Sequence, residues 1–375
     1  MAIYLDNAAT TPVLSQAAAE MCEVLIGDFG NPNSLYDLGL KAQKMLEMSR
    51  IKVAREISCS PSDLYFTSGA TEANNIAILG AARARKLWGT DVIVAGFEHP
   101  SVLNTVYALR DEGFTVTVVN PEKNGAIDIN KIVQKVGKGT ALVACMHVNN
   151  ETGALTNVAA LSKQVKERNH RTALHCDYVQ GFLKFKLDVS GIDTVSVSAH
   201  KVGGPKGIGA MFMRKGFNIA TVVHGGNQEK GVRSGTQNVA GAAGFAKAAE
   251  LHGDIGQNLK TVTALNKDLR GKLEGMSGIA LNSPADASPY ILNFSVLGYK
   301  SETILHFLEA RGIYVSSGSA CTRGARSHTL ESMDIPEENI DSAIRVSFES
   351  KNTAEQVKLL CEALVEAQKS LVRSE

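Results

Sequence analysis

Short apolar runs alternate with helical patterns through the middle of the 375-residue chain. Between about residues 59 and 215 the runs are, in order, DLYFT, DVIVAG, TVTVV, ALVACMHV, TALHCD, TVSVSA and IGAMFM. Helical patterns such as those at 72–88 and 159–169 separate them. Strands that are apolar almost throughout and are separated by helices are typical of a mostly parallel sheet covered on both faces. The pattern therefore predicts an α/β fold with helices flanking the sheet.

The pattern changes near residue 253. A helical stretch at 239–253 is expected to close a large domain, and a helix at about 254–276 leads into a smaller α+β region with strands at YILNFSV, IYVSS and AIRVSF. A last amphipathic helix follows a T-x-x-Q capping box formed by Thr353 and Gln356. The expected boundaries are 13–253 for the large domain, 254–375 for the small C-terminal domain, and 1–12 for a segment that packs with the small domain.

Composition and charge narrow the class of protein. The 39 basic and 38 acidic residues give a formal net charge of +1, which argues against a nucleic-acid protein held by a large basic excess. We expect no signal peptide and no membrane span, because there is no basic leader with an apolar core and no run of about 18 apolar residues. The six cysteines are scattered without a C-x-x-C pair, which disfavours a zinc or thioredoxin motif and favours a reducing, cytoplasmic location.

Polar and ionisable residues follow five of the predicted strands. The strands lead in turn into SGATEANN, FEHPS, VNNETG, DYVQG and SAHKVGGPKG. Because ligands of such sheets bind beyond the carboxyl ends of the strands, these segments are expected to meet at one edge. Their His, Asp, Asn, Gln and Lys residues exceed what polar loops alone predict, so this edge is the candidate site.

Lys201 follows an apolar strand in SAHKVGGPKG. An isolated lysine in a glycine-rich turn is most simply solvated, but Ser198 and His200 lie beside this one and the glycines leave room for a ligand. A lysine in a confined site shifts its pKa readily and forms Schiff bases. The cofactor that uses such a lysine is pyridoxal phosphate.

Other segments meet the needs of this cofactor. Its phosphate needs donors at a helix N-terminus, and SGATEANN is a strand-to-helix turn that offers Gly69, Ala70 and Thr71. The simpler reading, which is compatible, is an N-cap formed by Ser68 or Thr71 with Glu72 favouring the helix dipole. The spacing of a Walker A loop is absent.

Three more residues suit the cofactor ring. Asp177 ends a strand, where a carboxylate would keep the pyridine nitrogen protonated, although alone it would be a turn or N-cap aspartate. Gln180 lies one turn further on, where it would bind the ring hydroxyl. His99 would stack on the ring and transfer protons, whereas a lone His–Pro is more often a turn.

The motifs resemble those of the cysteine desulfurases of the NifS/IscS type, which belong to the class V aminotransferase group of pyridoxal-phosphate enzymes. The segments that carry the resemblance are, in the family's order, YLDNAATTP, GNPNS, SGATEANN, EHPSV, HVNNETG, SAHKVGGPKGIGA, RSGTQN, SSGSACT and RVSF. The resemblance covers nearly the whole chain. It implies the fold of type I pyridoxal-phosphate enzymes, a cofactor-binding large domain, and a homodimer with its active site between subunits.

By matching position, the resemblance also implies residue roles. Lys201 would be the Schiff-base lysine that moves the Cα proton, and Asp177 would bind the pyridine nitrogen. His99 would lie over the ring and act as an acid or base. The remaining roles are Asn150 and Gln180 at the ring hydroxyl, Ala70, Thr71, Ser198, His200 and Thr236 of the partner subunit at the phosphate, and Arg345 with Asn33 at the substrate carboxylate. No metal site is expected.

Cys321 lies in SSGSACTRGARSH, among small residues and ahead of Arg323 and Arg326. The resemblance implies that its thiolate attacks the sulfur of L-cysteine, so that Cys321 becomes a persulfide and the substrate leaves as L-alanine. The sulfur would then pass to an acceptor protein or thiol. Taken alone, Cys321 would be an exposed thiol.

The chain departs from the family at three places, which are GNPNSLY, GGNQEKG and a shortened segment between Cys321 and His328. A shorter tether would restrict the acceptors that Cys321 reaches. The sulfur route stays open between iron–sulfur cluster assembly, tRNA thiolation, and thiamine or molybdenum-cofactor synthesis.

Competing functions also stay open. They are a selenocysteine lyase, an aminotransferase that does not need Cys321, and a degenerate relative that only binds partners. A dinucleotide oxidoreductase is disfavoured because no strand leads into G-x-G-x-x-G. Of the other cysteines, Cys145, Cys176 and Cys361 are expected in the core, whereas the places of Cys22 and Cys59 stay open.

Overall fold

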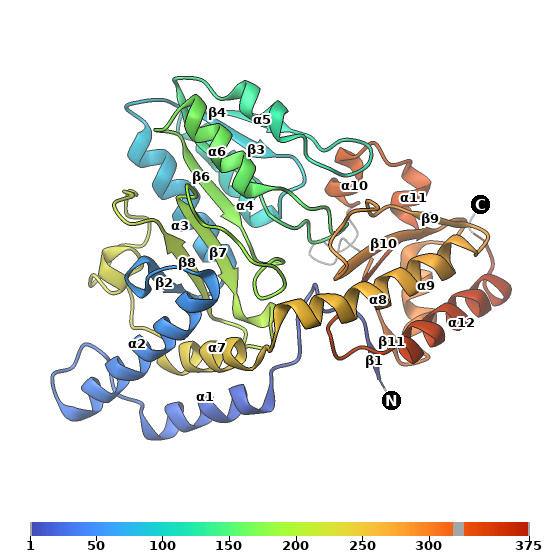
Figure 1. Cartoon of the computed structure of the whole chain (residues 1–375), viewed down its shortest axis with the longest axis horizontal. Helices are drawn as coiled ribbons and strands as arrows, with labels where there is room; N and C mark the ends of the chain where they lie inside the picture. The colour runs from blue at the N-terminus through green and yellow to red at the C-terminus, as the bar shows by residue number, and fades with distance from the viewer. Residues whose placement is uncertain (1, 318–325, 374–375) are drawn as a thin grey trace.

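A seven-stranded sheet forms the centre of the larger part of the molecule (Figure 1). The computed structural model describes residues 2–317 and 326–373. Across the sheet the strands are β2 (Leu64–Thr67), β8 (Gly209–Met213), β7 (Thr194–Ser198), β6 (Ala173–Asp177), β5 (Thr140–Ala144), β3 (Asp91–Ala95) and β4 (Thr115–Val119). Only β8 breaks the parallel order, because it pairs antiparallel with both β2 and β7. The predicted α/β fold with a mostly parallel sheet is confirmed.

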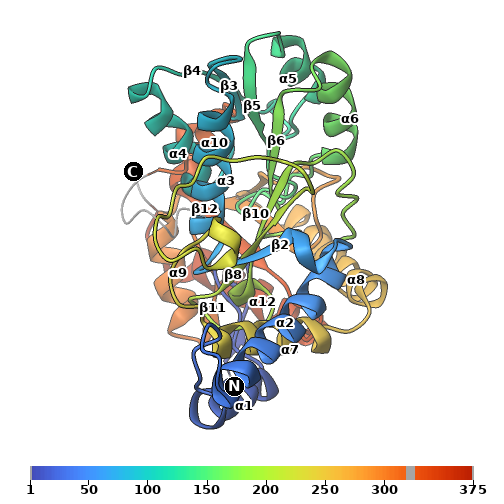
Figure 2. The same ribbon diagram turned by 90° about the vertical axis from the view of Figure 1, so that its left-hand side faces the viewer.

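Helices cover both faces of this sheet, which explains why its strands are apolar almost throughout. In β3, Ile93 packs in the core cluster on one face, and Val92 and Val94 pack in the cluster on the other face. The first face is covered by α2 (Asp37–Ile57), α5 (Ile129–Lys135), α6 (Val158–Arg168) and α7 (Val239–Leu251), and the second by α3 (Ala70–Arg85) and α4 (Pro100–Asp111). The helix α1 (Ser15–Gly27) packs against α7 (Figure 2).

A second apolar core lies beside the first. It is built on a three-stranded antiparallel sheet of β12 (Ala343–Ser347), β10 (Ile291–Val296) and β9 (Ile279–Leu281). The helices of this part are α8 (Ile255–Glu274), α9 (Ser301–Glu309), α10 (His328–Ser332), α11 (Glu337–Asp341) and α12 (Ala354–Ser370). The predicted capping box is present, because Thr353 and Gln356 satisfy each other's backbone N–H groups at the start of α12.

The N-terminal segment belongs to this second core although it precedes α1 in the chain. β1 (Ile3–Tyr4) pairs in parallel with β11 (Ile313–Tyr314). Leu5 and Ala8 are buried in the same cluster. The chain therefore starts in the second core and then enters the first.

Two predicted elements differ in extent from the observed ones. The predicted strand at 141–148 ends at Ala144, although the N–H groups of Cys145 and His147 still donate to carbonyls of the neighbouring strand β6. The predicted helix at 72–88 begins at Ala70 and ends at Arg85, where the N–H of Trp88 turns back to the Arg85 carbonyl. Cys145, Cys176 and Cys361 are buried as predicted, Cys59 is half-buried, and Cys22 is exposed.

Within residues 2–317 and 326–373, every helix is too short or too polar to cross a membrane.

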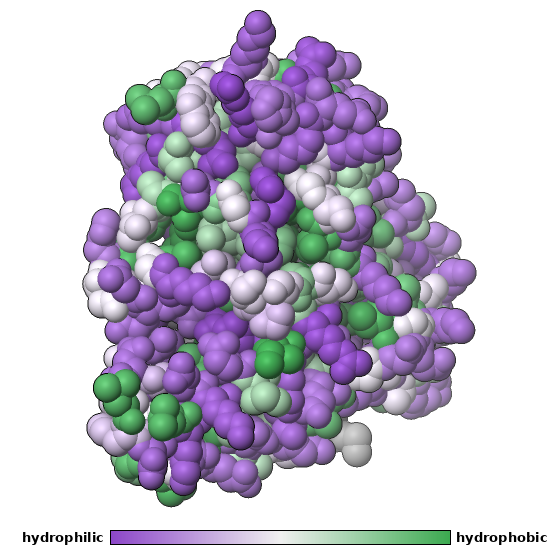
Figure 3. Space-filling view, turned by 60° about the vertical axis from the view of Figure 1, so that its left-hand side comes forward, coloured by the Kyte–Doolittle hydropathy of each residue, from purple (hydrophilic) through white to green (hydrophobic). Residues whose placement is uncertain are grey.

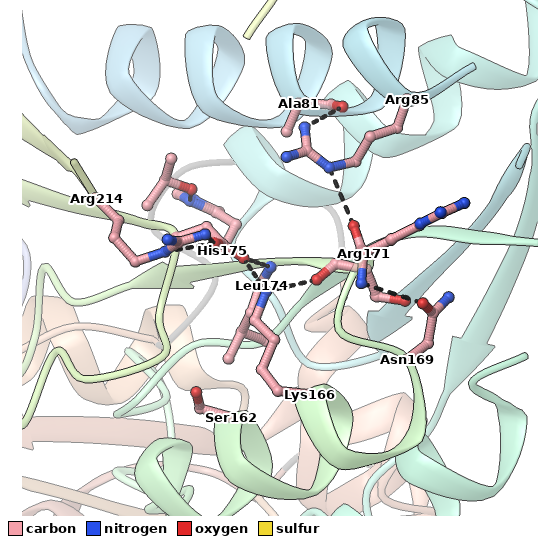
Figure 4. Close-up of polar contacts among 12 residues, drawn as sticks. Ala81, Arg85, Ser162, Lys166, Asn169, Arg171, Leu174, His175 and Arg214 are labelled. Carbon is pink, nitrogen blue, oxygen red and sulfur yellow. Dashed lines mark hydrogen bonds and ion pairs between the residues drawn. The ribbon is translucent and has the colours of Figure 1, made fainter. Parts of the chain in front are cut away.

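A buried ion cluster stabilises the large sheet at the edge opposite the carboxyl ends of its parallel strands. Asp193, just before β7, is fully buried and accepts hydrogen bonds from Lys166 Nζ at 2.5 Å and from Arg214 Nη2 at 2.7 Å. It also accepts from the Leu174 N–H at 2.8 Å, so one carboxylate joins α6, β6 and the end of β8. Figure 4 shows Lys166 and Arg214 approaching the strand of Leu174 from two sides.

Replacing Asp193 with alanine should lower the free energy of unfolding by about 3 kcal/mol, because it leaves two cations and a buried N–H without their shared acceptor. The measurement is urea unfolding followed by circular dichroism. Glu250→Ala is the matched control, because Glu250 forms an exposed ion pair with Lys52 and its loss should change little. Equal effects of the two substitutions would contradict this account of the cluster.

Candidate functional site

A cavity of about 620 Å³ lies beyond the carboxyl ends of the parallel strands. Its walls come from the large sheet, from the N-terminal segment and from β12, so both cores contribute. The residues expected at the site that line it are Ala70, Thr71, His99, Asn150, Asp177, Gln180, Ser198, His200, Lys201 and Arg345. Two others, Asn33 and Thr236, do not line it and are exposed on this chain. Cys321 and Arg323 lie outside the described residues.

Lys201 lies in a 3₁₀ turn, Ala199–Lys201, directly after β7. Its Nζ donates to the carbonyl oxygens of Ala8 at 2.6 Å and Ala9 at 2.7 Å. The same segment is held at a second point, where the Thr11 N–H donates to the His200 carbonyl at 2.8 Å. The N-terminal segment thus forms one wall of the cavity and holds the lysine amine at that wall.

Asp177 ends β6 and is almost fully buried. Its Oδ1 accepts from the Val179 N–H at 3.0 Å and its Oδ2 accepts from Asn74 Nδ2 at 2.8 Å. Both donors are neutral, and a buried carboxylate is stabilised further by a positive group at its free lone pairs. A protonated pyridine nitrogen in the cavity would be such a group.

His99 is the N-cap of α4 and faces the same cavity. Its Nδ1 accepts from the Ser101 N–H at 3.1 Å and lies 2.8 Å from Ser101 Oγ. Burial lowers the pKa of His99, Asp177 opposes that shift, and Lys201 adds to it. The ring is therefore neutral at pH 7, and an imidazole with one free nitrogen can accept or donate a proton.

The N-terminus of α3 forms another wall of the cavity. Gly69 is the N-cap and no side chain caps this helix, so the simpler alternative of a cap by Ser68 or Thr71 is wrong. The Ser68 N–H donates to Glu72 Oε2 at 2.5 Å and Glu72 pairs with Arg233, and no side chain caps the first amides of α3. An uncapped helix N-terminus facing a cavity suits an anion such as phosphate.

His200 and Ser198 line the cavity as well. Burial, followed by the charges of Lys201 and Lys206, lowers the pKa of His200 to about 4. Its Nδ1 lies 3.2 Å from Thr10 Oγ1. A neutral imidazole here leaves a ring nitrogen that can donate to a phosphate oxygen.

Arg345 projects from β12 and is almost fully buried. Its Nη2 forms an ion pair with Asp6 Oδ1 at 2.8 Å, and its Nη1 donates to the Asn150 carbonyl at 2.9 Å. Its buried Nε has no hydrogen-bond acceptor within the described part of the chain. An arginine that lines a cavity with an unused donor is suited to bind a carboxylate.

Sequence reasoning missed several residues that support the site. Asp6 lies in the segment YLDNAATTP, but the sequence did not indicate its partner, because Arg345 is 339 residues away. Asn74 and Ser101 lie within the segments SGATEANN and EHPSV, so their place in these motifs was the available signal. Lys206 lines the cavity from the GGPKG turn, where a second lysine was the available signal. Among the described residues, no group of histidine, cysteine or acidic side chains is placed to hold a metal ion.

Comparisons with known proteins agree with this geometry. Residues 3–360 match the family described as "Aminotransferase class-V". The chain is 36% identical to "Cysteine desulfurase IscS" of Clostridium botulinum over 374 residues, which cover 96% of this chain and 93% of the relative. A solved structure described as "NIFS-LIKE PROTEIN" superposes with a TM-score of 0.93 at 34% identity and covers 99% of this chain and 100% of that one. Another, described as "SspA in complex with cysteine", has a TM-score of 0.82 at 30% identity, covering 94% and 100%.

Buried neutral histidines near the cavity predict that the protein loses stability in mild acid. His147 lies between the rings of Tyr178 and Phe185, and burial lowers its pKa to about 4. The unfolded chain protonates this ring below its ordinary pKa of about 6.5, so the stability that the neutral ring contributes is complete above that pH and is lost as the pH falls toward 4. One such histidine accounts for about 2 kcal/mol between pH 7 and pH 5.

The measurement is urea unfolding at pH 7 and pH 5 for wild type and His147→Phe, comparing the difference between the two pH values. We expect the difference to shrink in His147→Phe and to stay unchanged in His170→Gln, because His170 is exposed. An unchanged difference in His147→Phe would contradict the assignment of a buried, neutral His147.

Proposed function

The chain belongs to the class V aminotransferase family and, within it, to the pyridoxal-phosphate-dependent cysteine desulfurases, and we propose how its own residues share the reaction. The enzyme converts L-cysteine to L-alanine and passes the sulfur to an acceptor. One observation carries the assignment of residues, namely that Lys201, Asp177, His99 and Arg345 face a single cavity although they come from distant parts of the chain.

The cavity fits the cofactor at both ends. The uncapped start of α3, with Ser198 and His200, would hold the phosphate, and Asp177 would hold the pyridine nitrogen. Lys201 would bind the cofactor covalently through Nζ. When bound, pyridoxal phosphate acts as an electron sink that stabilises negative charge on the Cα of an amino acid.

Arg345 would bind the carboxylate of L-cysteine. Its Nη2 and Nη1 already hold Asp6 and the Asn150 carbonyl, which fixes the guanidinium plane, and each of these two nitrogens keeps a second N–H for a ligand. The substrate thus takes its orientation from an arginine whose rotamer is set before binding. Lys201 would then move the Cα proton, and the neutral ring of His99 would accept or return a proton beside it.

Cys321 would take the sulfur. Its thiolate forms a bond to the sulfur of the bound cysteine while the C–S bond breaks, and the electron pair left on carbon is protonated to give alanine. Ser316 and His328, described residues on either side of the segment that contains Cys321, both contact residues at or next to the cavity lining. The Ser316 N–H donates to the Arg345 carbonyl at 3.1 Å, and His328 Nε2 lies 2.9 Å from the carbonyl oxygen of Glu98, next to His99.

A homodimer is part of this proposal. Exposed apolar side chains gather on α1, α2 and the loop between them, and Figure 3 shows apolar patches at the lower end of the molecule, where Figure 1 places these helices. Leu35 is 92% exposed and Ile26 is 80% exposed, and grouped apolar side chains exposed to this extent are typical of a protein–protein interface. Asn33 and Thr236, which do not reach the cavity of their own chain, would contribute to the site of the partner.

The domain division, acceptor and location are also proposals. The two apolar cores support a large domain at 13–253 and a small domain at 254–375 that includes residues 1–12. The acceptor would be an iron–sulfur scaffold or a thiolation enzyme. A cytoplasmic location is supported by the free thiols of Cys22, Cys59, Cys145, Cys176 and Cys361.

Cys321→Ala should bind the cofactor normally but form neither alanine nor sulfide from L-cysteine, because the sulfur has no thiolate to receive it. The measurement combines the visible cofactor spectrum with alanine and sulfide assays in the presence of a thiol reductant. Cys22→Ala, which removes an exposed thiol, should keep wild-type turnover. Alanine formed by Cys321→Ala, or formed only with a keto-acid acceptor, would favour an aminotransferase.

The double variant Ile26→Asp/Leu35→Asp should sediment as a monomer at concentrations at which the wild type is a dimer, because charges replace apolar contact area. Leu87→Asp is the matched control, because Leu87 is equally exposed but follows α3. A dimer that persists unchanged in the double variant would place the subunit interface elsewhere.

A further inference from the structure

Asn74 is fully buried in α3, one turn after the cavity residues Ala70 and Thr71. Its amide contacts three side chains from two other elements, β6 and α4. Nδ2 donates to Asp177 Oδ2 at 2.8 Å and to Ser101 Oγ at 2.8 Å, and Oδ1 lies 2.9 Å from His175 Nε2. Both N–H bonds and the carbonyl oxygen of this amide are therefore used.

Asp177 determines which way the amide points. An ionised carboxylate only accepts hydrogen bonds, so the nitrogen of Asn74 must face it. The oxygen of Asn74 then faces His175, and His175 must carry its proton on Nε2. Burial lowers the pKa of His175 to about 4, and its Nδ1 lies 2.9 Å from Thr194 Oγ1, which can donate to it. Each hydrogen bond in this series, from Thr194 to Asp177, therefore has a defined donor and a defined acceptor.

The direction of the bonds extends to His99. Ser101 Oγ accepts from Asn74, so its own hydrogen is free to point at His99 Nδ1, 2.8 Å away. The Ser101 N–H points at the same nitrogen. His99 therefore holds its proton on Nε2, and Nδ1 stays an acceptor.

We propose that Asn74 is a positioning residue for the reaction, because its single amide orients Asp177 toward the cofactor ring and directs the Ser101 hydroxyl to His99. This inference rests on the proposed function. Asn74 does not line the cavity, so it acts through the two residues that do. Its amide donates to Asp177 Oδ2, so it fixes the orientation of the carboxylate that would bind the pyridine nitrogen.

The test compares Asn74→Ala with Asn75→Ala in the purified holoenzyme. Asn75 is the next residue of the same helix, is half-buried, and donates only to the Thr71 carbonyl, so it controls for changes in helix propensity and for the loss of an asparagine. The readouts are the dissociation constant of pyridoxal phosphate, the pH midpoint of its visible absorption band, and the kcat and KM for L-cysteine.

Asn74→Ala should raise the dissociation constant about tenfold, the loss expected for one hydrogen bond to a charged group. The pH midpoint should move by about half a unit or more. The kcat should fall about tenfold with little change in KM, because Arg345 is untouched. Asn75→Ala should match the wild type in every readout.

Asn74→Asp provides a second variant of nearly identical shape. It replaces the N–H donor with an acceptor that faces Asp177, so its midpoint should move further than that of Asn74→Ala. The titratable groups that act on Asp177 and His99 are unchanged in both variants; they are Glu98, His175, Cys176, Lys201 and His328.

Two outcomes are distinguishable. If wild type binds no cofactor, the proposed function fails. If wild type binds it, and both Asn74 variants lower the melting temperature but keep the wild-type midpoint and dissociation constant, Asn74 is only structural and the inference is overturned.

Discussion

The hydrogen bonds from Lys201 Nζ to the carbonyls of Ala8 and Ala9 join the two cores of the molecule at the site itself. Lys201 follows a strand of the large sheet, whereas Ala8 is buried in the second core. The ion pair between Asp6 and Arg345 adds a second link through the same short segment. The cavity therefore forms only when both cores are folded and packed against each other.

The chemistry of the site follows from burial that leaves histidines neutral. His99, His175 and His200 all have lowered pKa values, in each case chiefly because they are buried. Neutral imidazoles can be fixed as donors or acceptors by their neighbours, which a charged ring cannot. The site thus concentrates positive charge on Lys201, Lys206 and Arg345, where an anionic cofactor and substrate would meet it.

The sequence predicted the sheet and most of the cavity because both depend on local patterns. Apolar runs identify strands, and the polar residue after each strand must lie at the sheet edge. The same patterns do not encode strand direction, so IGAMFM looked no different from its parallel neighbours although β8 runs antiparallel. They also do not encode partners, so the pairing of Asp6 with Arg345 and the contacts of Asn74 became visible only in three dimensions. The role of Cys321 stays a prediction, because it lies outside the described residues.

The position of the first strand has a consequence for synthesis on the ribosome. β1 pairs with β11, and the Ser347 N–H donates to the Leu5 carbonyl, so residues 3–5 find these partners only after residue 347 has been made. Domains generally fold from the N-terminus during translation, yet here the opening segment must wait while the large sheet forms behind it. A nascent chain can thus assemble most of the cofactor's surroundings and still lack the wall that holds Lys201. This wall of the cavity can therefore form only after the strands β11 and β12 have been made.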